Sequence, residues 1–368
     1  MNSVRIDRQA IRRNYQALAA QVGGQAQVMA VIKADGYGHG MVEMATILQA
    51  VGASHFAVAT VEQGVLLRQA GIKGRLVVLL GGLAAEIPAM QSYALEPALF
   101  DADQFAQFRA AAARLPAPLP VHLKVDCGMG RLGFNPAEVG TWSEKLRAAR
   151  GLELAALMSH FPSADVDLQL TRRQNELFGR CLETVRSHHA GVKAHIANSA
   201  ATLLGRDFHW DLVRPGLALY GCYPSPDPQW RHTPLVPAMT VATTLVQVEA
   251  APAHKGVSYG HLDRTSRPSR LGVLPLGYAD GFSRSLSGGV GQVLIRGQRA
   301  PVMGRVCMNV TVVDVTDIPG ACRGDEVIIM GQQGNDQIRA EEIAAWMGTI
   351  NYEVLCLLGN TMPRHYFN

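Results

Sequence analysis

The stretch Val28-Met29-Ala30-Val31-Ile32-Lys33-Ala34-Asp35-Gly36-Tyr37-Gly38-His39-Gly40 joins a short apolar run to a loop that is rich in glycine. The apolar residues 28–32 predict a buried strand, and the periodic residues 41–51 predict a helix. The three glycines allow the backbone to turn sharply or to approach a ligand closely. Lys33 is therefore expected where a strand ends and a loop begins, which is where parallel α/β proteins place their chemistry.

The same pattern of apolar run, polar tip and helical segment recurs along the first part of the chain. Strand candidates lie at residues 28–32, 55–59, 76–80, 95–100, 121–125, 152–158, 192–196 and 212–213. Most of them are followed by a helical segment, which is typical of a (β/α)8 TIM-like barrel. A doubly wound open sheet is the alternative, because it is built from the same units.

A cluster of prolines marks a domain boundary after the last of these strands, at positions 224, 226, 228, 234 and 237. Short strands separated by Gly, Pro and Asp follow it and predict a C-terminal mainly-β domain. We expect the barrel at 8–230, and the β domain at 231–368 together with a strand at 2–7. The elements expected in the β domain are strands at 240–248, 271–276, 292–295, 310–315, 327–330 and near 353–358, with a helix at 340–347.

The composition sets limits on the class of protein. A chain of 368 residues with 48% hydrophobic and 17% charged residues can bury two sizeable cores. Its net charge is only +4, and its basic residues lack interleaved aromatic residues, so nucleic-acid binding is not indicated. No apolar run could span a bilayer, and the N-terminus lacks a signal core, which predicts a cytoplasmic protein without a membrane partner. The six cysteines form no C-x-x-C pair, so no metal site is expected.

Lys33 alone has two interpretations: a surface lysine at a strand end, or an amine that forms a Schiff base. A free lysine has a pKa near ~10.4 and is not nucleophilic, so the second interpretation requires burial or cationic neighbours. Other polar residues share its position at or just past a strand end: Lys124, His160, Asn198 and Arg214. In a barrel these ends converge on one face, which predicts a single site.

Lys33, followed at the fourth residue by Tyr37 with glycines interleaved, resembles the pyridoxal-phosphate (PLP) lysine motif of alanine racemases. The resemblance extends in order from Ile6 to Pro363-Arg364. It implies a barrel that binds pyridoxal 5'-phosphate through Lys33 and an enzyme that interconverts L-alanine and D-alanine. In bacteria, enzymes of this family supply D-alanine for peptidoglycan.

The resemblance implies a set of contacts to the cofactor. The positions that match phosphate-binding residues are Tyr37, Ser199, Gly216, Leu217 and Tyr352. His160 and Asn198 match polar residues around the ring. Arg214 matches the arginine that faces the pyridine nitrogen. Because arginine stays charged, it keeps that nitrogen unprotonated, which weakens the ring as an electron sink and suppresses side reactions.

Further matches concern the substrate. Arg131 and Met308 match the residues that bind its carboxylate. Lys124 matches a lysine that is often carbamylated and then braces the arginine. The positions that match an entry channel are Asp165, Tyr278 and Arg284.

Racemisation needs a base on each face of a planar intermediate, and one base cannot easily serve both. Lys33 is one such base. Tyr259, in Val257-Ser258-Tyr259-Gly260, matches the opposite base of the family. In the family this tyrosine enters the site from the other subunit, so the resemblance implies a homodimer with shared active sites.

One residue departs from the family pattern. Asn309 stands where aspartate commonly follows Cys-Met, which leaves open a serine racemase or one of broad specificity. Two alternatives of other classes are a non-catalytic PLP-binding homeostasis protein and a barrel-type PLP decarboxylase. The extra β domain with Tyr259 argues against the first, and Arg214 in place of a carboxylate argues against the second.

Overall fold

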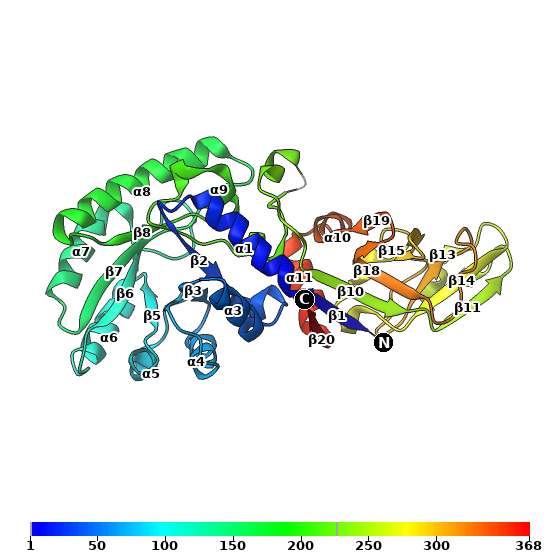
Figure 1. Cartoon of the computed structure of the whole chain (residues 1–368), viewed down its shortest axis with the longest axis horizontal. Helices are drawn as coiled ribbons and strands as arrows, with labels where there is room; N and C mark the ends of the chain where they lie inside the picture. The colour runs from blue at the N-terminus through cyan, green and yellow to red at the C-terminus, as the bar shows by residue number, and fades with distance from the viewer. Residues whose placement is uncertain (1, 226) are drawn as a thin grey trace.

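The chain folds into a closed parallel barrel and a mainly-β domain, which lie end to end (Figure 1). The computed structural model describes residues 2–225 and 227–368, so Pro226 of the expected boundary lies outside the described residues. The barrel strands are β2 (Gln27–Val31), β3 (His55–Val58), β4 (Arg75–Val78), β5 (Glu96–Leu99), β6 (Leu119–Lys124), β7 (Leu152–Met158), β8 (Lys193–His195) and β9 (Leu212–Val213). The predicted (β/α)8 fold is confirmed. The open sheet is wrong, because β9 pairs with β2 and closes the ring.

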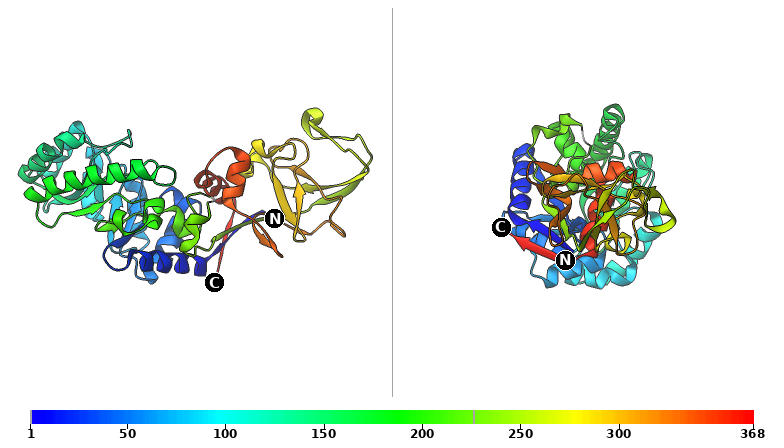
Figure 2. Two further views of the ribbon diagram at one scale, coloured as in Figure 1. Left: turned by 90° about the horizontal axis from the view of Figure 1, so that it is seen from above. Right: turned by 90° about the vertical axis from the view of Figure 1, so that its right-hand side faces the viewer.

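Helices surround this barrel, as two further views show (Figure 2). They are α1 (Arg8–Val22), α3 (Met41–Ala50), α4 (Val61–Gln69), α5 (Ile87–Ser92), α6 (Ala102–Ala112), α7 (Val139–Ala148), α8 (Leu168–His188) and α9 (Ser199–Leu204). Helix α1 shows how the sequence determines where a helix begins and ends. Asp7 caps α1 by accepting hydrogen bonds from the amides of Gln9 and Ala10, and Gly23 ends it with a φ of 68°.

The main sheet of the β domain includes both ends of the chain. Its strand order is β16-β15-β18-β10-β1-β20, and β19 pairs with β18. β1 pairs antiparallel with β10 and parallel with β20. The bounds are β1 (Ser3–Asp7), β10 (Met239–Thr244), β15 (Gln292–Ile295), β16 (Gln298–Pro301), β18 (Glu326–Gln333), β19 (Asp336–Ile338) and β20 (Arg364–Phe367).

Smaller sheets and two helices complete this domain. The sheets pair β11 (Gln247–Ala251), β14 (Ser269–Leu274) and β17 (Thr311–Asp314), and separately β12 (Gly256–Val257) and β13 (Asp263–Arg264). The helices are α10 (Ala340–Met347), as predicted, and α11 (Asn351–Thr361).

Two predictions for the β domain are wrong. The expected strand near 353–358 lies inside the helix α11. Val354, Leu355 and Leu358 are buried at helical spacing, but so short an apolar run does not distinguish a strand from a helix. The expected strand 240–248 is two strands, β10 and β11, which belong to different sheets.

Lys33 begins a single turn, α2 (Lys33–Tyr37), whose backbone is left-handed. Residues 34–37 all have a positive φ, between 51° and 63°. This conformation costs roughly 1–2 kcal/mol for each residue other than glycine. Asp35 offsets part of that cost, since its carboxylate accepts a hydrogen bond from the amide of Met41 at 2.7 Å and pairs with Arg364 at 2.5 Å.

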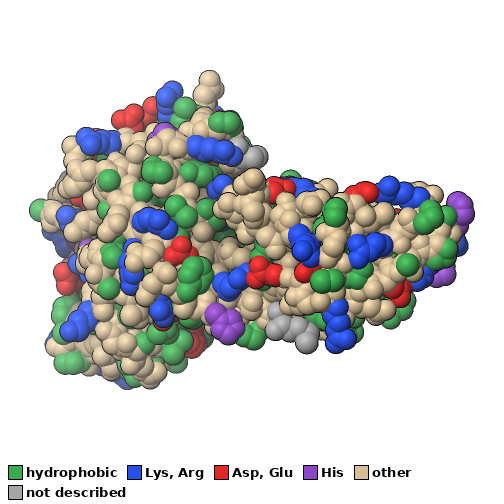
Figure 3. Space-filling model, turned by 45° about the vertical axis from the view of Figure 1, so that its right-hand side comes forward, with side chains coloured by type: hydrophobic (Ala, Val, Ile, Leu, Met, Phe, Trp, Pro, Cys, Tyr) green, Lys and Arg blue, Asp and Glu red, His purple; other side chains and the backbone are tan. Residues whose placement is uncertain are grey.

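The space-filling view shows the barrel as a broad body and the β domain as a narrower arm (Figure 3). Several large apolar side chains are exposed on this arm: Tyr259, Leu262, Tyr278, Val290, Met308 and Val310. Among the helices of the described residues, none has the length and apolar character needed to cross a membrane.

Candidate active site

A cavity of about 420 Å³ lies at the carboxyl ends of the barrel strands. Active sites of such barrels lie at this face. The sequence-predicted residues that line the cavity are Lys33, Tyr37, Lys124, Arg131, His160, Asn198, Ser199, Arg214, Gly216, Leu217 and Tyr352. The structure therefore brings together residues that are separated by up to 319 positions in the sequence, from Lys33 to Tyr352.

Lys33 lies in this cavity in an environment that disfavours its charged form. Burial lowers the pKa of its amine, and the positive charges of Arg131 and Arg214 lower it further. A lysine with a lowered pKa has a larger neutral fraction near pH 7, which makes it a better nucleophile and base.

Hydrogen-bond donors converge at one end of the cavity. Ser199 Oγ accepts hydrogen bonds from the amides of Gly216 at 3.0 Å and Ala218 at 3.2 Å. Leu217 is the first residue of the 3-10 helix η4 (Leu217–Tyr220), so its amide has no acceptor within that helix. The amide of Leu217 and the hydroxyl proton of Ser199 are therefore the donors at this end that can bind an anion.

Two tyrosines complete this end of the cavity. A Cβ atom on Gly216 would lie 2.3 Å from the hydroxyl of Tyr37, so only glycine leaves room for that hydroxyl. The ring centroid of Tyr37 lies 5.9 Å from that of Tyr352. Within residues 2–225 and 227–368 neither hydroxyl has a hydrogen-bond partner, and both remain able to donate to a ligand. The donor set fits the phosphate group of PLP.

Asn198 has its side chain engaged by the protein. Its Oδ1 caps α9 by accepting a hydrogen bond from Ala201 N at 3.0 Å, and its Nδ2 donates to Phe161 O at 3.2 Å. Asn198 therefore holds the start of α9, and with it Ser199, in position at the cavity wall.

Arg214 is held by acceptors on both terminal nitrogens. Nη1 donates to Nδ1 and to the carbonyl oxygen of His195, at 2.6 and 2.9 Å. Nη2 donates to the carbonyl oxygen of Ser159 at 2.6 Å and to His160 Nδ1 at 3.2 Å. Because Nδ1 of His160 accepts, the proton of that neutral ring is on Nε2. Burial lowers the pKa of Arg214 to about 10, so it keeps its charge at neutral pH.

Lys124 ends β6 inside the same cavity. Burial lowers the pKa of its amine to about 8, and the charges of Arg214 and Arg131 act in the same direction. Arg131 lies on a loop that Asp126 organises by accepting hydrogen bonds from backbone amides, including Arg131 N at 3.1 Å. A lysine this close to neutrality beside an arginine is a suitable amine for reaction with carbon dioxide.

The remaining sequence-predicted residues do not line this cavity: Asp165, Tyr259, Tyr278, Arg284 and Met308. Asp165 follows β7 and lies near Tyr352. Burial raises the pKa of Tyr352 to about 12, and the negative charge of Asp165 acts in the same direction. The other four belong to the β domain. Tyr259, Tyr278 and Met308 are exposed by 70%, 45% and 57%.

The loops that carry these exposed residues lie next to one another. The amide of Tyr278 donates to Cys307 O at 3.0 Å, and Ser258 Oγ donates to Arg305 O at 2.7 Å. Tyr259 and Met308 are the next residues along their loops. Tyr259, Tyr278 and Met308 are thus exposed residues of adjoining loops, and we call them the Tyr259 surface.

Sequence reasoning missed some residues of the site. Cys356 lines the cavity one helical turn after Tyr352 on α11, and the expectation of a strand at 353–358 hid this relationship. His195 was also missed, although it contacts Arg214. A histidine within the apolar strand candidate 192–196 was the available signal.

Comparison with known proteins agrees with this arrangement. The family model of the alanine racemase N-terminal domain matches residues 6–224, and that of the C-terminal domain matches 238–366. An alanine racemase of Nitratidesulfovibrio vulgaris (strain DSM 19637 / Miyazaki F) is 40% identical over 368 residues, which cover 99% of this chain and 97% of that protein.

Solved structures are similar over the whole chain. Alanine racemase from the D-cycloserine producing Streptomyces lavendulae has a TM-score of 0.94 at 35% identity, covering 99% of this chain and 96% of that one. Alanine racemase from Bartonella henselae, with covalently bound pyridoxal phosphate, has a TM-score of 0.89 at 30% identity, covering 100% and 99%. With both family domains matched in order and relatives similar along their full length, this chain belongs to the alanine racemase family of enzymes.

Proposed function

We propose that this protein is a PLP-dependent racemase that interconverts L-alanine and D-alanine with two bases, Lys33 and the Tyr259 of a partner subunit. The observation that carries the proposal is the cavity in which the lowered-pKa amine of Lys33 lies among the donors that fit a phosphate. The covalently bound pyridoxal phosphate of the B. henselae relative supports the same cofactor here.

The residues of this chain divide the binding of PLP among them. Tyr37, Ser199, Tyr352 and the amides near Gly216 hold its phosphate, and Lys33 holds its aldehyde carbon. When bound, PLP withdraws electrons from the α carbon of an amino acid and makes its proton acidic. The amine of Lys33, when it is not bonded to the cofactor, would exchange a proton with one face of that carbon.

Arg214 would face the pyridine nitrogen of bound PLP and control its protonation. Its guanidinium is charged and can only donate hydrogen bonds, so a protonated nitrogen opposite it would meet both a like charge and a second donor. An unprotonated ring withdraws fewer electrons, which favours rapid return of the proton to the α carbon. This property suits a racemase better than a decarboxylase.

The substrate carboxylate requires a cation and donors at the other end of the cavity. Arg131 supplies the cation. A carbamate on Lys124 would pair with Arg131 and hold its guanidinium in place, and the pKa of about 8 for Lys124 supports this modification. The amide of Met308 on the partner subunit is a further donor, and Asp165, Tyr278 and Arg284 border the entry channel.

The second base comes from a second copy of the chain. Tyr259 is 70% exposed and does not line the cavity of its own subunit. The apolar Tyr259 surface is suited to burial against another molecule. In a homodimer with shared active sites it would cover the cavity of the partner. Tyr259 then serves the face of the α carbon opposite Lys33.

A preference for serine is the second candidate, and Asn309 favours it. Asn309 Nδ2 donates to Asp280 Oδ2 at 3.3 Å, which ties it to the Tyr278 loop. Aspartate at 309 would instead place two carboxylates together. With Asn309 in place of aspartate, the mouth of the pocket has one carboxylate fewer and would therefore tolerate a more polar substrate.

The biological role follows from the activity. An alanine racemase in the cytoplasm of a bacterium would supply D-alanine for peptidoglycan.

The experiment is circular dichroism of L-alanine incubated with the PLP-loaded protein, with L-serine in parallel. Decay of the alanine signal to zero, absent in Lys33→Ala, is the expected result. Faster decay with serine would move the assignment to the second candidate. An unchanged signal with both substrates, at full cofactor occupancy, would contradict the proposal.

The roles of the two bases can be distinguished by comparing the reaction from L-alanine with the reaction from D-alanine. We assign Tyr259 to proton abstraction from L-alanine and Lys33 to abstraction from D-alanine. Tyr259→Phe should therefore slow abstraction from L-alanine far more than from D-alanine, measured as loss of α-deuterium. Equal slowing for both enantiomers would contradict the assignment.

A further inference from the structure

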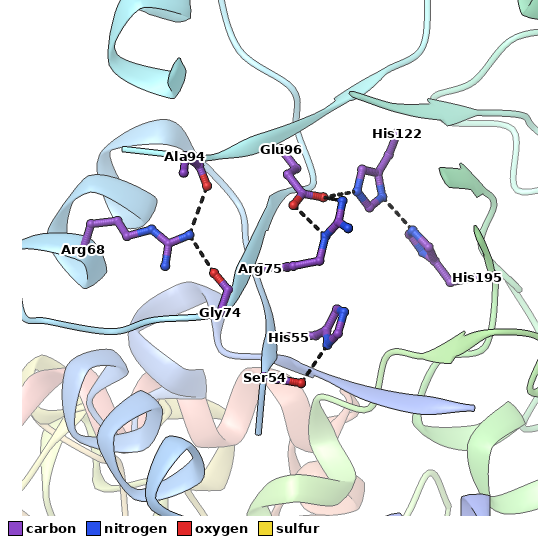
Figure 4. A network of polar contacts seen from close by, with 9 residues as sticks. All are labelled: Ser54, His55, Arg68, Gly74, Arg75, Ala94, Glu96, His122 and His195. Carbon is purple, nitrogen blue, oxygen red and sulfur yellow. Dashed lines mark hydrogen bonds and ion pairs between the residues drawn. The ribbon is translucent and has the colours of Figure 1, made fainter. Parts of the chain in front are cut away.

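A continuous chain of hydrogen bonds extends from Arg214 away from the cavity. Arg214 Nη1 lies 2.6 Å from His195 Nδ1, and His195 Nε2 lies 2.7 Å from His122 Nδ1. His122 Nε2 in turn lies 2.8 Å from Glu96 Oε2. Figure 4 shows Glu96, His122 and His195 pointing toward one another, with the guanidinium of Arg75 beside the carboxylate of Glu96.

This chain crosses the interior of the barrel. Glu96 is the first residue of β5, His122 lies within β6, and His195 is the last residue of β8. Arg214 directly follows β9 at the cavity. Barrel interiors are ordinarily filled by branched apolar side chains. Here the space is occupied by polar groups that are at most 6% exposed and that satisfy one another.

The hydrogen bonds of this chain can run in only one direction. Arginine only donates, so His195 Nδ1 accepts and its proton is on Nε2. That proton is donated to His122 Nδ1, which leaves the proton of His122 on Nε2, directed at the carboxylate of Glu96. A carboxylate only accepts. The two ends therefore demand the same orientation, with both histidines neutral.

The carboxylate of Glu96 cannot be replaced by an amide without conflict. Arg75 donates to both of its oxygens, Nε to Oε1 at 2.7 Å and Nη2 to Oε2 at 2.8 Å. An amide NH2 group at either position would meet a donor of Arg75. Where it replaced Oε2, it would also donate to His122 and reverse both histidines, leaving an N–H of His195 opposed to an N–H of Arg214.

The consequence for Arg214 is a fixed orientation of its guanidinium. Its Nη1 and Nη2 protons are taken by His195, His160 and backbone carbonyls of the barrel rim. In the contacts of the described residues, Nε–H has no acceptor and remains for a ligand in the cavity. Reversal of the histidine pair would replace one acceptor of Nη1 by an opposing N–H of His195 at 2.6 Å, which would push the guanidinium away from this orientation.

We propose that Glu96 is a positioning residue for racemisation, which fixes the tautomers of His122 and His195 and thereby the orientation of Arg214 toward the pyridine nitrogen. The inference rests on the proposed function for its kinetic consequence, but the tautomers belong to the protein alone. We call the hydrogen-bonded chain from Glu96 to Arg214 the relay. It conducts no proton, because Arg214 keeps its charge.

The test compares Glu96→Gln with the wild-type protein by ¹⁵N NMR of histidine-labelled apoenzyme. The wild type should show His195 unprotonated at Nδ1, and Glu96→Gln should show a mixture of tautomers. In the PLP-loaded dimer, the variant should lose about tenfold in kcat for alanine with KM changed less than about twofold. The pH dependence of its cofactor absorbance should shift as well.

Two further variants separate orientation from packing. His122→Gln retains an acceptor for His195 and a donor for Glu96, so it should preserve the His195 tautomer and most of kcat, whereas His122→Leu should lose both. Asp211→Asn is the matched control. Like Glu96, Asp211 pairs with an arginine of the barrel domain, Arg186 at 2.7 Å, but it lies outside the relay. Loss of this ion pair in Asp211→Asn should therefore leave the His195 tautomer and kcat unchanged.

An unchanged His195 tautomer in Glu96→Gln, or a kcat equal to that of the wild type, overturns the proposal. If Glu96→Gln does not fold, the His122→Gln and His122→Leu pair decides it by the same two readouts. If the His195 tautomer shifts in Glu96→Gln but the wild-type protein neither binds PLP nor racemises alanine, the proposed function is refuted. The role of Glu96 in fixing the tautomers would then still hold.

Discussion

A Cβ atom on Gly359 would lie 2.4 Å from the carbonyl oxygen of Gly38. The reverse also holds, since a Cβ on Gly38 would lie 2.9 Å from the Cα of Gly359 and 2.5 Å from the carbonyl oxygen of Leu355. The turn that carries Lys33 therefore rests directly on the backbone of α11, which carries Tyr352. The glycines of the Lys33 stretch serve close approach, as expected, but here the partner of Gly38 is a helix of the same chain.

This contact predicts that Gly359→Ala weakens cofactor binding. Glycine-to-alanine substitution inside a helix is ordinarily stabilising, by about 1 kcal/mol. At Gly359 the added methyl group must instead push α11 away from Gly38 and separate Tyr352 from Tyr37. We expect the dissociation constant for PLP to rise about tenfold or more, measured by fluorescence titration of the apoenzyme.

Gly140 supplies the control, because it also lies in a helix, α7, and a Cβ there would meet only a methyl group of Thr184 at 3.2 Å. Gly140→Ala should bind PLP as the wild type does. Equal PLP affinity in both variants would show that the Gly38–Gly359 contact does not hold the phosphate site.

Shared active sites predict complementation between two inactive variants. A Lys33→Ala homodimer and a Tyr259→Phe homodimer each lack one base in both sites. A mixed dimer contains one site with neither base and one site with Lys33 from one subunit and Tyr259 from the other. Mixing after reversible dissociation should therefore restore up to about one quarter of the wild-type activity, since half of the dimers are mixed and each has one intact site.

Activity is measured as D-alanine formed from L-alanine, which both homodimers should form slowly. If Tyr259 served the cavity of its own subunit, no mixed dimer would hold an intact site and mixing would restore nothing.

The pKa of Lys124 predicts a carbamate that increases with pH. Carbon dioxide reacts with the neutral amine, and the neutral fraction of a group with a pKa of about 8 grows as the pH rises through 8. Protein equilibrated with ¹³C-bicarbonate should show a carbamate signal in ¹³C NMR that is stronger at pH 9 than at pH 7. Lys124→Arg should lack this signal at both values, and a signal that survives the substitution would place the carbamate elsewhere.

Glu96 predicts a loss of stability in acid. Burial raises the pKa of its carboxyl group, but hydrogen bonds from His122 and Arg75 outweigh burial and lower the pKa to about 2. A folded-state pKa below the unfolded value near ~4.3 stabilises the protein at higher pH, and this stabilisation disappears as the pH falls from about 4 towards 2.

The loss amounts to ~3 kcal/mol at most. Urea unfolding at pH 6 and pH 3 should thus show a larger fall in unfolding free energy for the wild type than for Glu96→Gln. Parallel curves for the two proteins would contradict the shift.

The sequence predicted the barrel because strand, polar tip and helix recur with a period that local hydrophobicity reveals. Residues at the strand ends, such as Lys33 and Arg214, were placed in one cavity by that topology alone. The relay was not predicted, because His122 and Glu96 become neighbours only when β5 and β6 pair inside a closed ring. Tyr259 was predicted only by resemblance, since among residues 2–225 and 227–368 no contact brings it to the cavity of its own chain.

The pairing of β1 with β10 and β20 has a consequence for the order of folding. Val4 lies opposite Val241 and beside Arg364, so the main sheet of the β domain joins the two extremes of the chain. The barrel strands β2 to β9 are contiguous and close a ring from local units. Loop-closure entropy favours such local pairing first. During synthesis the barrel can form before β1 has its partners, and the main sheet of the β domain is completed only once β20 has been made.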